Sequence, residues 1–164
     1  MILIITNHEW EVSEVDMMKQ NVRELLLREE RARKQILFPF LTSLGLTPGQ
    51  GQAGILFHLL EKDHITQREL ADICNLNAAT MSRNLDKLEN MGFLNRETNP
   101  DCRRSFLICL TEKGRIEASK IEKIFNQFDT IIGNDISEKD METFCRILLK
   151  ICDNLEAYKS DQEQ

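Results

Sequence analysis

Apolar residues at helical spacing dominate the chain, and most predicted helices begin at a recognisable signal. Residues 16–44 predict one long helix, charged in RELLLREERARKQ and apolar in ILFPFLTSLGL, which Pro39 is expected to bend or break. TPGQ at residues 47–50 is typical of a capping box with proline at the first helical position. It predicts a helix whose apolar positions are Ile55, Leu56, Leu59 and Leu60.

Two shorter helices follow. TQRE at residues 66–69 is a second capping box, and it predicts a short helix with one apolar side. Residues 64–65, just before it, could form a very short strand. After a tight connection, Asn77 is suited to cap a helix that stops at Gly92. Two short helices joined by a tight turn form the helix-turn-helix pattern.

The second of these helices has two distinct faces. Its apolar positions Met81, Leu85 and Leu88 are predicted to pack inward. The opposite side carries Thr80, Arg83 and Lys87, with Ala79 nearby and Ser82 on the flank. Small hydrogen-bonding side chains let a helix enter a DNA major groove about 12 Å wide and reach phosphates or base edges. The alternative is the solvated face of an ordinary helix bundle.

The next segment predicts a β-hairpin. Residues 92–97 and 105–110 are strand-like, and the second strand alternates Phe106, Ile108 and Leu110 on one side. The residue types of TNPD at residues 98–101 are typical of a turn. This places Cys102, Arg103 and Arg104 at or just past the tip of the hairpin. A basic hairpin directly after a helix-turn-helix is a wing. Its arginines can contact the DNA backbone or a narrow minor groove.

The charge distribution supports a local nucleic-acid face on an acidic body. The 164-residue chain has a net charge of −6, and it is long enough for one well-cored domain. Residues 67–115 carry eight basic and seven acidic side chains, a net charge of +1, so the remainder carries −7. Phosphate attraction depends on charges within about a Debye length, so the local surplus matters more than the total.

Cysteine usage and hydropathy exclude several classes of protein. Five cysteines are an odd number, and without a signal peptide they are expected to stay reduced. No CxxC pair is present and the three histidines lie at no zinc-ligand spacing, so we expect no metal and no cofactor. No apolar run approaches the roughly 18 residues that span a bilayer. We therefore expect a cytoplasmic protein without membrane contact.

The chain ends carry more apolar helix than one such domain needs. Residues 111–132 and 141–155 each present an apolar stripe, which must be buried against something. Ser137 and Asp140 could cap the last helix, and Cys152 is expected to be a small core residue in its stripe. A homodimer interface would bury these surfaces.

Three segments together resemble the MarR family of transcriptional regulators. They are LTPGQ, ITQRELADICNLNAATMSRNLDKLENMGFLNRE and NPDCRRSFLICLTEKG, in order from Leu46 to about Gly114. The resemblance implies a mainly α fold with a small β-hairpin wing, namely a winged helix-turn-helix with N- and C-terminal dimerisation helices. The expected divisions are a tail and dimerisation helix at 1–45, the DNA-binding domain at 46–114 and dimerisation helices at 115–164.

The same resemblance implies a sequence-specific DNA-binding regulator. Family members are homodimers that often repress from a pseudo-palindromic operator and often respond to small anionic or phenolic ligands, or to oxidation. Thr80, Ser82 and Arg83 match the recognition-helix TxSR positions, Arg104 matches the wing arginine, and residues 110–114 match LTxxG. The expected DNA-binding residues are Gln67, Ala79, Thr80, Ser82, Arg83, Asn84, Lys87, Arg103 and Arg104.

One position departs from the family pattern. Cys102 stands where the family's DxR wing motif has aspartate, so a carboxylate that orients the arginine is replaced by a thiol, although Asp101 could substitute. An exposed thiol beside two arginines could be a redox sensor. The alternative is a neutral surface replacement, which is the simpler interpretation because neighbouring charge is a weak indicator of thiol reactivity.

Two other classes of function, an enzyme and a protein-contact module, fit the sequence less well than DNA binding. An enzyme is not expected, because the chain has no HExxH, Walker A, GxSxG or GxGxxG motif. A winged helix can also serve protein contact alone, since a fold does not dictate function. That role would predict an apolar or acidic recognition face, whereas this one is polar and basic.

Overall fold

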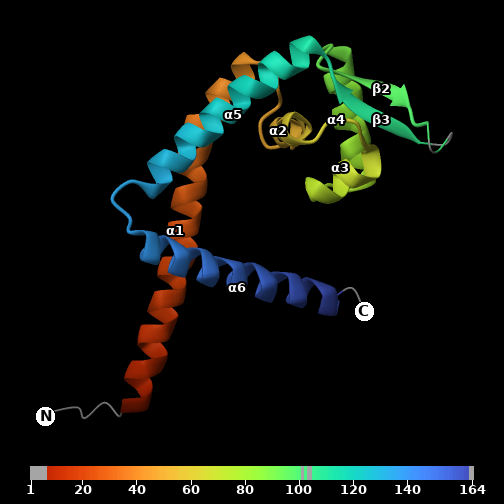
Figure 1. Cartoon of the computed structure of the whole chain (residues 1–164). Coiled ribbons are helices and arrows are strands. Elements are labelled where there is room, and N and C mark those ends of the chain that lie inside the picture. Colours follow the sequence, from red (N-terminus) through yellow and green to blue (C-terminus); the bar gives the residue numbers. More distant parts are fainter. Residues whose placement is uncertain (1–6, 101, 103–104, 163–164) are drawn as a thin grey trace, which may run out of the picture. The chain divides into compact units, whose positions relative to one another are not determined.

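The computed structural model describes residues 7–100, 102 and 105–162, and in them it is mainly helical with one small sheet (Figure 1). The elements are α1 (Asn7–Ser43), α2 (Gln52–Glu61), β1 (Ile65–Thr66), α3 (Gln67–Ile73), α4 (Ala78–Asn90), β2 (Leu94–Thr98), β3 (Phe106–Leu110), α5 (Glu112–Gly133) and α6 (Glu138–Gln162). The predicted fold class, mainly α with a β-hairpin, is confirmed. No helix in these residues is long and apolar enough to span a membrane.

The chain forms two compact units, Met1–Ile121 and Glu122–Gln164. The core of the first unit consists of side chains from the end of α1, the three short helices, the sheet and the start of α5. Its largest fully buried members are Ile55, Leu56, Leu59, Leu70, Met81, Leu85, Leu88, Leu94, Ile108 and Ile121. This core supports both the helix-turn-helix and the hairpin.

Helix α1 continues through Pro39, so the predicted break is wrong. Proline removes one backbone hydrogen bond and costs about 3 kcal/mol inside a helix. Leu37 and Leu41, on either side of it, are buried. Each such leucine contributes about 1.5–3 kcal/mol on burial, which offsets the proline cost.

Helix α2 begins later than the sequence pattern predicts. Gly49 has φ +77° and Gly51 has φ +84°, and this left-handed backbone cannot lie within a right-handed helix. The helix therefore starts at Gln52, whose side-chain oxygen accepts a hydrogen bond from the Thr47 amide at 2.8 Å. The predicted capping box at residues 47–50 is wrong.

The capping box at the start of α3 is confirmed. The Glu69 amide donates to the Thr66 hydroxyl at 3.2 Å, and the Thr66 amide donates to the Glu69 carboxylate at 2.9 Å. Hydrogen bonds from the Thr66 amide and hydroxyl lower the pKa of the Glu69 carboxyl. This cap fixes where the first helix of the helix-turn-helix begins.

Replacing Thr66 with alanine is expected to lower the free energy of unfolding by about 1 kcal/mol, because it removes the acceptor for the Glu69 amide. Urea denaturation followed by circular dichroism would measure this loss. Thr42→Ala is the control: Thr42 is an exposed threonine of α1, and its replacement should change stability by less than about 0.5 kcal/mol. Equal stability of the two variants would contradict the capping role.

The sheet is antiparallel in the order β1-β3-β2. Leu94 pairs with Leu110 and Thr98 with Phe106, while Ile65 of β1 pairs with Ile108 on the other edge of β3. Ile108 and Leu110 are buried as predicted, but Phe106 is 54% exposed because it lies at the hairpin end, beyond the core. Cys109, between the two buried residues, is buried as well, so the strand is covered on both faces at this end and the predicted alternation is not observed.

The second unit contains the remainder of α5 and α6. The Asp140 amide donates to the Ser137 hydroxyl at 3.2 Å, so the predicted cap of α6 is confirmed. Cys152 is exposed in the single chain, which is contrary to its predicted core position. Phe144, Ile147, Leu149, Leu155 and Tyr158 of α6 are also exposed. The apolar stripe of α6 is therefore not buried within one chain.

Candidate nucleic-acid interface

A tight turn sets the two helices of the helix-turn-helix against each other. Helix α3 ends at Ile73 with Cys74 as its C-cap, and Asn75 takes the left-handed conformation with φ +50°. The Leu76 amide donates to the Ala71 carbonyl at 2.9 Å. Asparagine tolerates this conformation better than most residues. Asn77 then caps α4, its side-chain oxygen accepting from the Thr80 amide at 2.9 Å. The predicted cap is confirmed.

The inner face of α4 holds it on the core. Met81, Leu85 and Leu88 are fully buried, as their spacing predicts. The helix ends at Asn90, and Gly92, with φ +72°, turns the chain into the hairpin. The outer face of α4 is therefore fixed in position by the packing of its inner face.

The exposed side of α4 presents Ala79 and Arg83 to solvent, with Thr80 half-buried beside them. The Arg83 side chain folds back along the helix, where its Nε donates to the Ala79 carbonyl at 3.3 Å and its Nη2 to the Thr80 hydroxyl at 3.4 Å. These long, exposed hydrogen bonds are weak. The guanidinium can therefore exchange them for a phosphate or a base edge.

Three other predicted DNA-binding residues are less exposed to solvent. Ser82 and Lys87 are half-buried on α4, and Gln67 is half-buried at the start of α3. The Lys87 ammonium hydrogen-bonds the Thr47 hydroxyl, which connects α4 to the loop before α2. A neutral hydroxyl leaves the positive charge of Lys87 uncompensated, so phosphate attraction remains.

The structure changes the prediction for Asn84, because its side chain is only 5% exposed. Its amide donates to the Gln50 carbonyl at 2.6 Å, and its oxygen accepts from the Gln52 side chain at 3.2 Å. A buried and bonded amide cannot reach DNA without breaking this network. Asn84 follows Met81 by three positions and so shares the inner face of α4, a signal that was present in the sequence.

The hairpin is confirmed, and its turn is held by local hydrogen bonds. The Asn99 side chain donates to the Ser105 hydroxyl at 2.9 Å, and the Ser105 amide donates to the Cys102 carbonyl at 3.0 Å. Cys102 is exposed. Asp101, Arg103 and Arg104 lie outside the described residues, so the DNA contacts of the two arginines stay predictions.

A cavity of about 860 Å³ lies where the helix-turn-helix faces the hairpin. Residues from the starts of α3 and α4 and from the end of the hairpin line it, including Gln67, Arg68, Asn77, Ser105 and Phe106. Arg68 is exposed and Ser105 half-buried. Neither residue is a candidate on sequence grounds, because only the fold brings the start of α3 beside the end of the hairpin.

Two of the local basic residues are engaged in ion pairs. Arg96 contacts Asp86 at 2.6 Å and also Glu89, so it joins β2 to α4. Arg115 pairs with Asp63. The surplus of positive charge at the interface therefore comes from other side chains, among them Arg68, Arg83 and Lys87.

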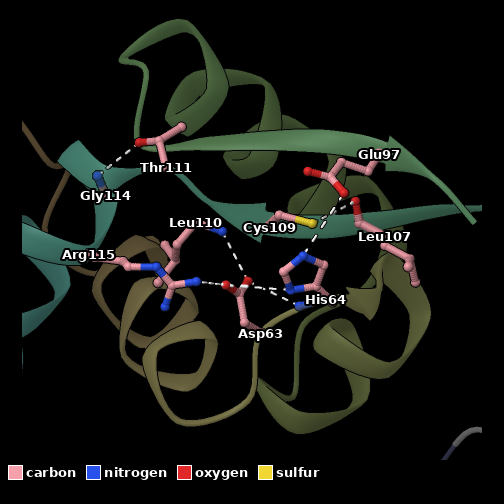
Figure 2. Close-up of polar contacts among 9 residues, drawn as sticks. All are labelled: Asp63, His64, Glu97, Leu107, Cys109, Leu110, Thr111, Gly114 and Arg115. Carbon is pink, nitrogen blue, oxygen red and sulfur yellow. Dashed lines mark hydrogen bonds and ion pairs between the residues drawn. The ribbon is translucent and has the colours of Figure 1, made fainter.

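The fold brings together three side chains of metal-ligand type that are not grouped in the sequence. Asp63, His64 and Cys109 each offer one ligand atom, and these atoms lie within 4.8 Å of one another. Cys109 is distant from the other two in sequence, so spacing rules could not detect the group. It lies at the sheet and not on the exposed face of α4 (Figure 2).

Comparisons with known proteins agree with this geometry. A family model described as MarR family matches residues 44–105. The crystal structure of the transcriptional regulator PA3341 is 33% identical, covering 83% of this chain and 98% of that one, with a TM-score of 0.67. The uncharacterised HTH-type transcriptional regulator YdgJ of Bacillus subtilis strain 168 is 28% identical over 134 residues, which are 80% of this chain and 79% of YdgJ.

A MarR transcriptional regulator from Methanosarcina mazei Go1 has the same fold, with a TM-score of 0.66 at 22% identity, covering 84% of this chain and 99% of that one. The resemblance inferred from the recognition-helix and wing motifs is confirmed. The chain therefore belongs to the MarR family, whose members are DNA-binding transcriptional regulators and not enzymes.

Proposed function

We propose that the protein is a homodimeric, ligand-responsive repressor that binds a pseudo-palindromic operator through residues 46–114. The main support for DNA binding is the exposed face of α4, which presents Ala79, Thr80 and Arg83 on a helix whose opposite side is fully buried. The proposed contacting residues are Gln67, Ala79, Thr80, Ser82, Arg83 and Lys87, with Arg103 and Arg104 from the wing. Asn84 positions α4 through the Gln52 network and does not touch DNA.

The start of α4 suits entry into a major groove. Ala78 and Ala79 are small and exposed, so the helix can approach base edges closely. Arg83 lies one turn further along and can make two hydrogen bonds to a guanine. Arg68 and Ser105, on either side of the cavity, are placed to contact the flanking phosphates.

A homodimer is supported by the apolar side chains left exposed in each chain. Val22, Leu25 and Leu27 of α1 are exposed, as are Phe144 and Leu155 of α6. Several large apolar side chains exposed on one helix are typical of an interaction surface. Residues 1–45 and 115–164 are the proposed dimerisation segments. Two recognition helices related by a two-fold axis would read half-sites about 10 bp apart.

Ligand response is supported by a second cavity, of about 350 Å³, beside the start of α5. Lys113 provides positive charge, and Lys120 also lines the cavity but pairs with Glu117 at 2.8 Å. Leu44, Met91 and Phe93 provide apolar surface. One oxygen of Glu117 is buried and has no hydrogen-bond partner among the described residues. A small phenolic or anionic effector could donate a hydroxyl to that oxygen and place its charge near the lysines.

Fluorescence anisotropy with labelled duplexes tests the DNA-binding part of this proposal. A randomised duplex library supplies the preferred site, and binding is then measured against mixed-sequence DNA at 50 and 200 mM salt. With six or more phosphate contacts per dimer, affinity should fall roughly 10³-fold between these concentrations. The bound complex should contain two chains, measured by light scattering.

Two results would contradict the proposal. Failure to bind mixed-sequence DNA even at low salt would favour a protein-contact role for the winged helix. Binding as a monomer would remove the two-fold operator geometry. Effector response is tested separately, by adding salicylate as a small anionic phenol to the preformed complex, with Lys113→Ala as the variant expected to respond less.

A further inference from the structure

Four side chains of metal-ligand type converge on the three strands at the base of the wing. His64 immediately precedes β1, Glu97 belongs to β2 and Cys109 to β3, and Asp63 lies beside His64. The His64 Nδ1 atom is 3.6 Å from an Asp63 oxygen, and its Nε2 atom is 4.0 Å from a Glu97 oxygen. Figure 2 shows the imidazole between these carboxylates, with the Cys109 sulfur beside it.

These separations are somewhat longer than those of a closed tetrahedral zinc site. Zinc lies about 2.0–2.3 Å from nitrogen, oxygen and sulfur ligands, so ligand atoms are separated by roughly 3.3–3.8 Å. The ligand atoms of Asp63, His64 and Cys109 are within 4.8 Å of one another. The His64 and Glu97 side chains are 55% and 51% exposed, so both can shift by the small distance that closure requires.

The local charge favours a cation. The carboxylates of Asp63 and Glu97 lie on either side of the His64 imidazole, and the Cys109 sulfur lies beside it. Arg115 neutralises part of this charge through its ion pair with Asp63. A divalent ion would compensate Glu97 and replace the thiol proton, which is how thiolates bind metals.

Asp63 is already positioned as a supporting group. One of its oxygens accepts from the His64 amide and from the Leu110 amide, both at 3.0 Å, and the other pairs with Arg115. That second oxygen also faces His64 Nδ1. A carboxylate that holds one imidazole nitrogen orients the other nitrogen toward a metal.

The backbone at His64 is unusual. Its φ is +57°, a left-handed conformation that residues other than glycine adopt rarely. The Asp63 carboxylate stabilises it by accepting the His64 amide hydrogen. Such conformations gather at functional sites, and here the conformation accompanies an imidazole placed between two strands and two carboxylates.

We propose that His64 Nε2, Cys109 Sγ and a Glu97 oxygen bind a zinc-class divalent ion, with Asp63 as the positioning residue on His64 Nδ1. An imidazole, a thiolate and a carboxylate are a ligand set that zinc accepts, with water completing the tetrahedron. The bound ion would join all three strands at the base of the wing. The proposed zinc site does not depend on the proposed repressor function.

Zinc titration by calorimetry on the full, reduced chain tests the proposal, after chelator treatment and desalting. One zinc ion per chain is expected, and cobalt(II) should give a thiolate-to-metal charge-transfer band. His64→Asn should weaken zinc binding by at least roughly 10- to 100-fold, since asparagine tolerates the positive φ but removes the imidazole. Glu97→Gln should weaken it as well, and Cys109→Ser should abolish the cobalt band.

Cys145→Ser is the matched control, because Cys145 is an exposed thiol of α6, and it should leave zinc binding unchanged. Zinc should also raise the thermal midpoint of the wild type and of Cys145→Ser but not of His64→Asn. If Cys109→Ser does not fold, the His64 and Glu97 variants decide the question. Equal zinc binding by the wild type and His64→Asn, or no stoichiometric binding by the wild type, would overturn the proposal.

Discussion

Arg83→Ala is expected to reduce operator affinity to the level of mixed-sequence DNA. A bidentate arginine contact to a base contributes about 1–3 kcal/mol of discrimination, and a homodimer would lose it in both half-sites. The combined loss of about 2–6 kcal/mol approaches the entire margin between specific and non-specific binding, which is about 4–10 kcal/mol. Competition anisotropy between the selected operator and mixed DNA measures this margin directly.

The fold should survive this substitution, because Arg83 is exposed and its own hydrogen bonds are to neighbours within α4. Unchanged circular dichroism and thermal unfolding would confirm that. Arg33→Ala is the matched control: Arg33 pairs with Glu29 one turn away on α1, so its loss removes the same charge away from α4. Operator binding by Arg33→Ala should equal that of the wild type.

Arg104→Ala is expected to behave differently from Arg83→Ala. Loss of a wing arginine that contacts phosphate weakens binding to all sequences alike, and in a homodimer it reduces the salt slope by about two, because one fewer counterion is released at each wing. Sequence preference should therefore persist. An Arg83→Ala protein that discriminates as well as the wild type would refute the placement of the DNA face on α4.

Local chemistry explains which parts of the structure could be predicted from sequence. The caps at Thr66, Asn77 and Ser137 each depend on a side chain and an amide three residues later, so the sequence contains the whole interaction. The buried stripe of α4 depends only on helical spacing. These signals were sufficient for the helix-turn-helix, and the turn residues at 98–101 between two strand-like segments were sufficient for the hairpin.

Tertiary contacts explain the parts that could not be predicted. Gln52 and Asn84 are distant in sequence but hydrogen-bonded, and the same network holds Thr47, which the pattern had made a helix cap. Cys109 meets His64 only because β1 and β3 pair. Helical spacing could have placed Asn84 on the inner face of α4, but the partners of Asn84, Gln52 and Cys109 have no local signature, since they are determined by the packing of the sheet and α4.

Gly114→Ala is expected to unfold the first unit or to displace the start of α5. A Cβ atom at this position would lie 1.8 Å from the Phe93 carbonyl oxygen and 2.7 Å from its carbon. The obstacle is backbone, not the end of a flexible side chain, and Phe93 is itself buried. We expect a loss of about 3 kcal/mol or more, at or above the upper end of ordinary overpacking.

The same contact explains why α5 is fixed to the hairpin. The Thr111 amide donates to the Phe93 carbonyl at 3.0 Å, and the Thr111 hydroxyl donates to the Gly92 carbonyl at 2.7 Å and accepts from the Gly114 amide at 2.9 Å. Moving α5 away to admit a methyl group would strain all three bonds. The threonine and glycine of the LTxxG pattern therefore act together, and neither needs to touch DNA.

Gly54→Ala is the matched control for Gly114→Ala. Gly54 lies in α2, and apart from its chain neighbours and the backbone of its own helix, no atom of the described residues lies within 4 Å of the Cβ that alanine would add. Alanine there should stabilise the protein by up to about 1 kcal/mol, because it has the higher helix propensity. Thermal unfolding of the two variants should therefore shift in opposite directions. A Gly114→Ala protein as stable as the wild type would show that α5 can leave the Phe93 carbonyl at little cost, and it would remove the anchor assigned to Thr111.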